Sequence, residues 1–316
     1  MPRLTKPRAL PPGGTFGIVA PAGPIDEQRL RAGVAMLEAA GFRAIHRDDV
    51  CSRRGYLAGD DPRRADELME MVENPEVDVV LCARGGYGSQ RIVPRLDPGR
   101  VRRAAKPFVG YSDATTLHLW MRRVVGLVSF HGPMLERGGD LQPEELEGLL
   151  AMLSGRSEGG RSWQGDPGRD GVGEGRLVGG NLSLVAGSLG TPWEIETRGA
   201  ILLVEEVHEE PYRVDRLLGQ LAAAGKLAGL AGVGVGALVD CVPTARPIDP
   251  ELHGAANGPS ARSALAEWLD PLGIPQVFGL PFGHQSPNQA WPLGVRARLD
   301  GKRGELHILE SGVRRP

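Results

Sequence analysis

Short apolar runs alternate with helical patterns along the first half of the chain. Strands are predicted at 15–20, 77–83 and 107–110, where compact apolar runs are followed by glycine, proline or polar residues. Helices are predicted at 26–40 and 113–123, where apolar residues recur three and four positions apart. Strands that alternate with helices form parallel sheets, so we expect a doubly wound α/β arrangement in this half.

The second half of the chain mixes strand and helix patterns. Strands are predicted at 200–205 and 233–240, with a helix between them at 212–224. Near the end of the chain, predicted strands at 295–299 and 305–309 flank the sequence DGKRG, which is typical of a β-hairpin turn. We therefore expect a smaller, mixed α/β region in this half.

A segment rich in glycine, serine and charge separates the two halves. A chain of 316 residues is long enough for two domains. We predict an N-terminal domain over 1–154, a linker over 155–176 and a C-terminal domain over 177–316. The predicted fold class is α/β, with a parallel-sheet N-terminal domain and a smaller mixed α/β C-terminal domain.

Charge and cysteine content limit the classes of partner. The chain has 37 Lys and Arg residues against 39 Asp and Glu, a formal net charge of −2, so we expect no nucleic-acid and no membrane partner. Cys51, Cys82 and Cys241 are far apart, which predicts neither a disulfide framework nor a metal site. Because the first residues lack the apolar stretch of a signal peptide, the expected location is the cytoplasm.

Ser112 is the candidate nucleophile, in the sequence GYSDA between a predicted strand and a predicted helix. A sharp strand-to-helix turn exposes a serine hydroxyl and needs small residues two positions before and after it, here Gly110 and Ala114. The start of the helix also offers backbone N–H groups that can bind an oxyanion. On the residues alone, the alternative is that Ser112 or Asp113 caps the helix.

A glycine loop, GGYG at 85–88, follows the second predicted strand. It lies at the edge of the sheet where ligands bind in open α/β folds. Its N–H groups suit a second oxyanion donor, or alternatively a phosphate. The loop lacks both the GxGxxG spacing and the lysine of nucleotide-binding loops, so the pattern gives little support to a dinucleotide site.

A serine nucleophile needs a base that a carboxylate orients. His131 and His284 both follow predicted strands and are equal candidates for the base. His208 lies in an acidic run without the HExxH pattern of zinc sites. The remaining histidines are expected at the surface or turned away from the serine: His46, His118, His253 and His307.

Glu205 is the candidate carboxylate, because it ends a predicted apolar strand and a strand end can direct a side chain into a cleft. The acidic residues after it are expected to continue into a polar loop: Glu206, Glu209 and Glu210. The alternative interpretation makes the whole acidic run a solvated loop.

Six ordered motifs make the chain resemble the LD-carboxypeptidase family of serine peptidases over nearly its whole length. The motifs are GIVAPAGPID at 17–26, ARGGYGSQRIVPRLD at 83–97, GYSDATTLHLW at 110–120, GGNLSLVAGSLGTPWE at 179–194, LVEEVHEEPYRVDRLL at 203–218 and PFGH at 281–284.

The resemblance implies a Ser-His-Glu triad without metal or cofactor. It makes Ser112 the nucleophile, His284 the base and Glu205 the orienting acid. The backbone N–H groups of Asp113 and Gly86 would bind the oxyanion. It further implies a Rossmann-like N-terminal domain that carries the serine and a C-terminal domain that carries the acid and the histidine, so that the triad assembles between them.

The resemblance also implies a function. The expected enzyme is a cytoplasmic, homodimeric LD-carboxypeptidase that releases the terminal D-alanine from muramoyl tetrapeptides, small peptide substrates, in cell-wall peptidoglycan recycling. One alternative is a microcin C-type immunity peptidase that cleaves aminoacyl-nucleotide analogues, with Trp163, Trp193 and Trp291 as candidates to stack on a base. A second alternative is a nonenzymatic Rossmann-like binding protein, in which Ser112 caps a helix and the glycine loop holds a phosphate.

Overall fold

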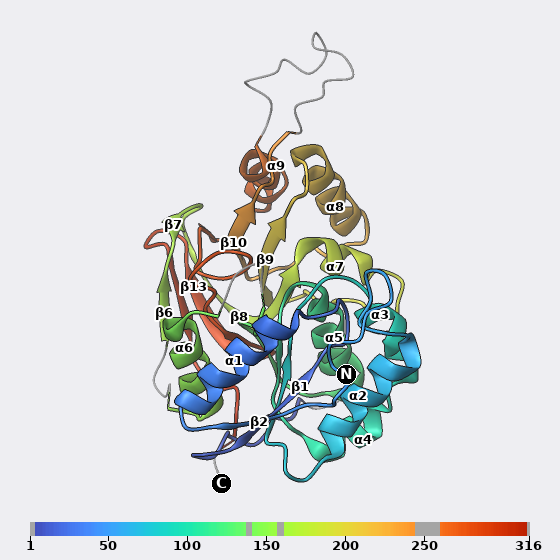
Figure 1. The fold of residues 1–316 in the computed structure, drawn as a ribbon. Helices are drawn as coiled ribbons and strands as arrows, with labels where there is room; N and C mark the ends of the chain where they lie inside the picture. The colour runs from blue at the N-terminus through green and yellow to red at the C-terminus, as the bar shows by residue number, and fades with distance from the viewer. Residues whose placement is uncertain (1–3, 137–140, 157–160, 244–259, 315–316) are drawn as a thin grey trace.

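Two β-sheets organise the chain in the computed structural model, which describes residues 4–136, 141–156, 161–243 and 260–314 (Figure 1). The first sheet has the strand order β12-β5-β4-β3-β1-β2. Its strands are β1 (Thr15–Val19), β2 (Arg43–Ile45), β3 (Val79–Cys82), β4 (Phe108–Gly110), β5 (Ser129–His131) and β12 (Trp291–Leu293). All neighbouring pairs are parallel except β12 with β5, and this confirms the parallel N-terminal sheet.

Helices connect the strands of the first sheet, as the alternating pattern predicts. They are α1 (Glu27–Ala39), α2 (Asp61–Glu73), α3 (Ser89–Ile92), α4 (Pro98–Ala104), α5 (Thr115–Trp120) and α6 (Pro143–Leu153). Short helical segments extend α5 on both sides, over Ser112–Ala114 and Met121–Val125. The first of these segments begins directly after β4, and it places Ser112 at the carboxyl edge of the parallel strands.

The second sheet has the order β6-β14-β13-β8-β9-β10-β11-β7 and mixes parallel with antiparallel pairs. Its strands are β6 (Arg161–Gln164), β7 (Asp166–Pro167), β8 (Val172–Asn181), β9 (Ala200–Val207), β10 (Gly232–Val239), β11 (Gln276–Phe278), β13 (Arg296–Asp300) and β14 (Glu305–Ile308). The accompanying helices are α7 (Leu182–Gly187), α8 (Pro211–Ala223) and α9 (Ala261–Leu269). The predicted hairpin is confirmed, since β13 and β14 pair antiparallel.

The segment 155–176, expected as a linker, carries strands where the structure describes it. It contributes β6, β7 and the first part of β8 to the second sheet. Its glycines serve close backbone packing: a Cβ atom on Gly173 or Gly175 would lie 1.9 or 2.5 Å from a carbonyl oxygen of a neighbouring segment. The chain after 177 also returns to the first sheet through β12, so the division into two domains stays a proposal.

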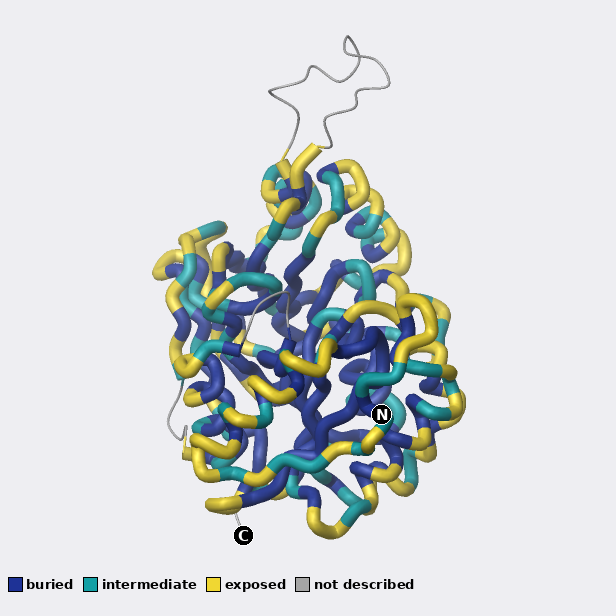
Figure 2. Tube along the Cα trace, in the orientation of Figure 1, coloured by how far each residue is buried: buried dark blue, intermediate teal, exposed yellow. Residues whose placement is uncertain are grey.

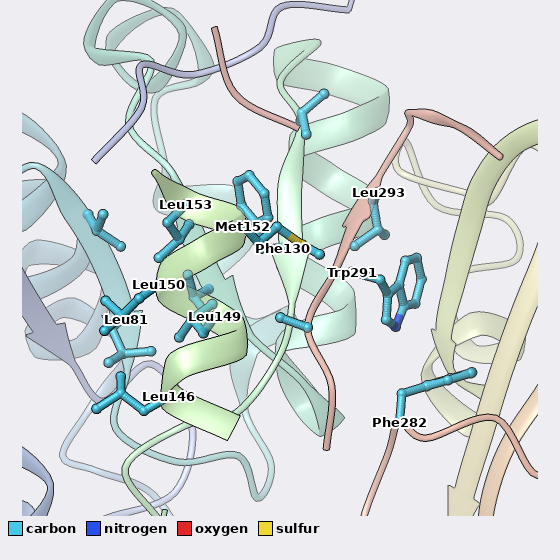
Figure 3. Packing of buried hydrophobic residues seen from close by; sticks show 14 of the residues in the cluster. Leu81, Phe130, Leu146, Leu149, Leu150, Met152, Leu153, Phe282, Trp291 and Leu293 are labelled. Carbon is cyan, nitrogen blue, oxygen red and sulfur yellow. The ribbon is translucent and has the colours of Figure 1, made fainter. Parts of the chain in front are cut away.

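A shared hydrophobic core joins the two sheets. One cluster of buried side chains contains Leu81 and Phe130 from the first sheet together with Leu203 from the second. Phe282 and Trp291, from the segment that follows β11, pack in the same cluster (Figure 3). Buried residues lie mainly along the strands of the two sheets, and exposed residues lie on the outside of the molecule (Figure 2). This common core fixes the edge of one sheet relative to the other, which matters because the candidate site residues come from both.

No helix among the described residues combines the length and the apolar character needed to cross a bilayer.

Candidate active site

Ser112 lies in a strained turn between β4 and the helix that follows. Its backbone φ is +60°, in the left-handed region that residues other than glycine rarely adopt. The small residues on both sides are required for close packing: a Cβ atom on Gly110 would lie 2.9 Å from Cβ of Ala114 and 3.0 Å from Sγ of Cys82. The turn therefore has the geometry that a nucleophile elbow needs.

Three side chains from distant parts of the chain form a hydrogen-bonded row. Nε2 of His284 lies 3.1 Å from Oγ of Ser112, and Nδ1 of the same ring lies 2.6 Å from Oε2 of Glu205. The Glu205 side chain is fully buried, and the His284 side chain is 16% exposed. A carboxylate at Nδ1 keeps the proton on that nitrogen, so Nε2 is free to accept the proton of the serine hydroxyl.

The loop that carries His284 is held by a buried carboxylate of α6. The backbone N–H of Gly283 donates to Oδ1 of Asn288 at 3.0 Å, and the N–H of Asn288 donates to Oε1 of Glu145 at 2.8 Å. Glu145 is fully buried. The ring of Tyr111, next to the serine, packs edge-on against the imidazole with centroids 4.9 Å apart. These contacts orient the imidazole from both halves of the chain.

Glu206, expected in a polar loop, is instead buried beside Glu205 near the end of β9. Its carboxylate accepts hydrogen bonds from Nδ2 of Asn181 and from the backbone N–H of Ser183, both at 2.8 Å. Burial raises the pKa of this carboxyl above its usual range. The prediction failed because β9 continues to Val207, and because the groups that satisfy Glu206 lie on β8 and α7, far from it in sequence.

The glycine loop after β3 lies directly against the serine. A Cβ atom on Gly85 would lie 2.9 Å from Cβ and 3.1 Å from Oγ of Ser112, so this position has room for glycine alone. Gly86 is exposed and has a φ of +108°. The carbonyl of Gly85 accepts the N–H of Gly23 at 2.9 Å, which ties the loop to the segment after β1. The loop thus borders the space in front of the hydroxyl.

Two charged side chains fix the far end of this loop. The carboxylate of Asp113 accepts the N–H groups of Gly88 at 3.3 Å and of Ser89 at 2.7 Å. The guanidinium of Arg64, which is fully buried, donates to the carbonyl of Gly88 at 2.9 Å and also to that of Pro21. Gly88 is therefore held at both its N–H and its carbonyl.

The helix-cap alternative for Ser112 and Asp113 does not hold. Neither side chain caps the helix that these residues begin. The Asp113 carboxylate reaches the start of α3 instead, while the Ser112 hydroxyl faces His284. Burial raises the pKa of the Asp113 carboxyl, against the lowering effect of the N–H groups that it accepts.

The competing histidines are buried and contact groups other than the serine hydroxyl. His118 is fully buried and bridges Oγ of Ser129 and the carbonyl of Gly110, both at 2.8 Å, and burial lowers its pKa to about 4. His131 is also fully buried, stacks on Trp291 at 5.1 Å, and has a pKa well below the usual range because of burial. The structure therefore separates His284 from His131, which the sequence pattern left equal.

The other singled-out residues lie at the surface or in the core. His46 and His208 are exposed, His307 is half-buried, and His253 lies outside the described residues. Trp163 and Trp291 are buried, which leaves the half-buried Trp193 as the most accessible of the three tryptophans considered for stacking on a base. Over the part of the chain that the structure describes, no group of three or more His, Cys, Asp or Glu side chains is placed to hold a metal ion.

Sequence reasoning missed three residues that position the site: Arg64, Glu145 and the carboxylate of Asp113. Each is a charged residue buried by partners distant in the chain, and charged residues on helices ordinarily face solvent. A usable signal was present for Arg64, because it lies one residue before Ala65 and four before Leu68, on the apolar face of α2.

Comparisons with known proteins match both halves of the chain to one family. The family model described as the LD-carboxypeptidase N-terminal domain matches residues 16–132, and the model of the LD-carboxypeptidase C-terminal domain matches residues 174–299. The chain is 38% identical to the "Probable murein peptide carboxypeptidase" of Bacillus subtilis (strain 168), over 98% of this chain and 95% of that one. It is 32% identical to the murein tetrapeptide carboxypeptidase of Pseudomonas aeruginosa, over 93% and 95%.

A solved structure shows the same fold. The crystal structure of muramoyltetrapeptide carboxypeptidase from Oxalobacter formigenes superposes with a TM-score of 0.82 and 33% sequence identity. The match covers 94% of this chain and 99% of that chain. The likeness thus extends over nearly the whole chain.

Proposed function

Because this chain belongs to the LD-carboxypeptidase family and is a serine-type carboxypeptidase, we propose that it releases the terminal D-alanine from muramoyl tetrapeptides. The observation that carries the proposal is the hydrogen-bonded row Ser112–His284–Glu205, together with the names of the murein peptide carboxypeptidases that the chain matches. A carboxypeptidase of this kind needs a nucleophile, a base and an oxyanion site, and each has a candidate here.

In the proposed reaction, the imidazole of His284 removes the proton of the Ser112 hydroxyl as its oxygen attacks the carbonyl before D-alanine. The N–H groups of Asp113 and Gly86 donate to the oxyanion of the tetrahedral intermediate. His284 then gives its proton to the leaving amine, the C–N bond breaks, and D-alanine departs from an acyl-enzyme. A water molecule, activated by the same imidazole, releases the tripeptide product and restores the serine. Glu205 holds the imidazole and stabilises its charged form.

We further propose that the enzyme works in the cytoplasm, in peptidoglycan recycling, as a homodimer. Cys51, Cys82 and Cys241 are all free thiols in the structure, which fits a reducing compartment. A muropeptide released from the wall and imported is a substrate that such an enzyme would meet there. Sedimentation analysis of the purified protein would give the state of assembly.

The proposal is tested by incubating the purified protein with the tetrapeptide L-Ala-D-Glu-diaminopimelate-D-Ala and its muramoyl form, and measuring free D-alanine. We expect release by the wild type and a loss of at least about 10³-fold in Ser112→Ala. An aminoacyl sulfamoyl adenylate serves as the comparison substrate. Turnover of the adenylate without D-alanine release, or equal D-alanine release by Ser112→Ala, would refute the proposed function.

A further inference from the structure

Two exposed tyrosine side chains form an edge-to-face pair beside the glycine loop. Tyr56 is 66% exposed and Tyr87 is 44% exposed. Their ring centroids lie 5.6 Å apart, with an angle of 70° between the ring planes. Exposed aromatic rings in mutual contact offer a preformed apolar surface with two hydroxyl groups, at little cost in side-chain freedom.

The pair is built on the loop that borders the serine. Tyr87 is a member of that loop, two residues after Gly85, whose Cα faces the side chain of Ser112. The segment of Tyr56 packs on the same loop, because a Cβ atom on Gly88 would lie 2.6 Å from Cδ2 of Leu57. The aromatic pair therefore lies on the loop that borders the candidate active site.

One charged side chain next to the pair is engaged by a carboxylate. Arg91 is close enough to interact electrostatically with both tyrosines. Its guanidinium, however, is bound by the carboxylate of Asp61 through three hydrogen bonds of 3.0 to 3.2 Å. The two rings themselves offer apolar faces and two hydroxyl groups, so the surface suits a ligand that combines apolar C–H groups with hydroxyls. A sugar ring has this chemistry.

The tyrosine pair lies within the reach of the proposed substrate. Between the bond that is cut and the muramoyl sugar, the substrate has three residues, which span about 10 Å when extended. The Cα of Tyr87 lies within about 7.6 Å of the Cα of Gly85, because two trans peptide units separate them, and the ring centroid of Tyr56 lies 5.6 Å from that of Tyr87. We propose that Tyr56 and Tyr87 form a saccharide subsite that binds the muramoyl sugar of the substrate. This inference rests on the proposed carboxypeptidase function.

The test compares two substrates that differ in the sugar alone, the muramoyl tetrapeptide and the free tetrapeptide. For each enzyme, the quantity measured is the ratio of kcat/KM with the sugar to kcat/KM without it. We expect this ratio to exceed one in the wild type and to fall about five- to tenfold in Tyr56→Ala, mainly through KM of the muramoyl substrate, because a remote contact of this kind stabilises ground state and transition state alike. Tyr87→Leu should lower the same ratio.

Tyr212→Ala is the matched control, because Tyr212 is 50% exposed on α8, outside the glycine loop. It should keep the wild-type ratio. An unchanged ratio in Tyr56→Ala and Tyr87→Leu, or an equal loss on both substrates, would overturn the saccharide subsite while leaving the proposed function intact. Failure of the wild type to release D-alanine from either substrate would overturn both.

Discussion

At the residue scale, the Ser112 hydroxyl depends on side chains that hold the imidazole of His284. Glu205 binds Nδ1 of the ring at 2.6 Å, and the ring of Tyr111 packs edge-on against the imidazole, with centroids 4.9 Å apart. Glu205 is itself confined, because it is fully buried and Gly283 packs against it. The serine, in turn, is aimed at the imidazole by a left-handed backbone conformation.

Replacing the buried carboxylate by an amide tests this account at one residue. In Glu205→Gln the amide can donate to Nδ1, which moves the ring proton to Nε2 and leaves no acceptor for the serine proton. We expect kcat for D-alanine release to fall by about 10³- to 10⁴-fold, the range seen when the carboxylate of a serine triad is lost.

The matched control is Glu174→Gln, a change of the same kind at a half-exposed glutamate on β8 that pairs with Arg296. It should keep the wild-type kcat, and both variants should keep the wild-type circular dichroism spectrum. A Glu205→Gln enzyme within tenfold of wild type would show that Glu205 does not orient the base.

Single residues also mark the limit of what the sequence can predict. Ser112, Glu205 and His284 were assigned from ordered motifs, and the structure brings all three within hydrogen-bond reach of their neighbours. Position in the sequence alone leaves His131 equal to His284, because it shows that each follows a predicted strand but not which side chain faces the serine. The burial of Glu206 could not be predicted either, because its partners come from β8 and α7.

At the element scale, the close approach of the glycine loop to the nucleophile turn shapes the site. The loop is held by Arg64 and by the Asp113 carboxylate at Gly88, and by the N–H of Gly23 at Gly85. Because three contacts hold it at Gly85 and Gly88, the loop has little freedom to move away from Ser112. A side chain at Gly85 would therefore displace the serine rather than the loop.

Gly85→Ala is the corresponding test. The added Cβ would lie 2.9 Å from Cβ of Ser112, closer than such atoms approach each other. We expect kcat to fall at least about tenfold, since a displacement of about 1 Å at a nucleophile can reduce rates by up to about 10². Gly187→Ala is the control, because a Cβ atom there meets no atom within 4 Å. Equal kcat in both variants would show that the loop yields and does not constrain the serine.

Elements near the site were predictable where the signal is local. The predicted strand at 107–110 is β4, and the predicted strand at 200–205 is β9, which extends two residues further to Val207. The segment 155–176 was assigned as a linker because glycine and charge dominate it. Its strands could not be predicted, because their partners are remote in sequence. For example, β6 pairs with β14, near the end of the chain, and that pairing leaves no local pattern.

At the scale of the whole molecule, the candidate site exists only where the two sheets meet. Ser112 follows a strand of the first sheet, Glu205 lies on a strand of the second, and His284 follows the last parallel strand of the second. The shared core and the return of β12 to the first sheet fix the relation between them. This arrangement makes the reactivity of the serine a property of both halves, and no segment of the chain carries it alone.

Labelling with a fluorophosphonate probe, followed by mass spectrometry of the modified peptide, tests this central claim most directly. The account predicts that the probe modifies Ser112 in the wild type. It also predicts that labelling disappears in Ser112→Ala. In His284→Ala, where the replaced residue follows a strand of the second sheet, labelling should fall by at least about 10³-fold. Modification of a different serine, or undiminished labelling of Ser112 in His284→Ala, would contradict it.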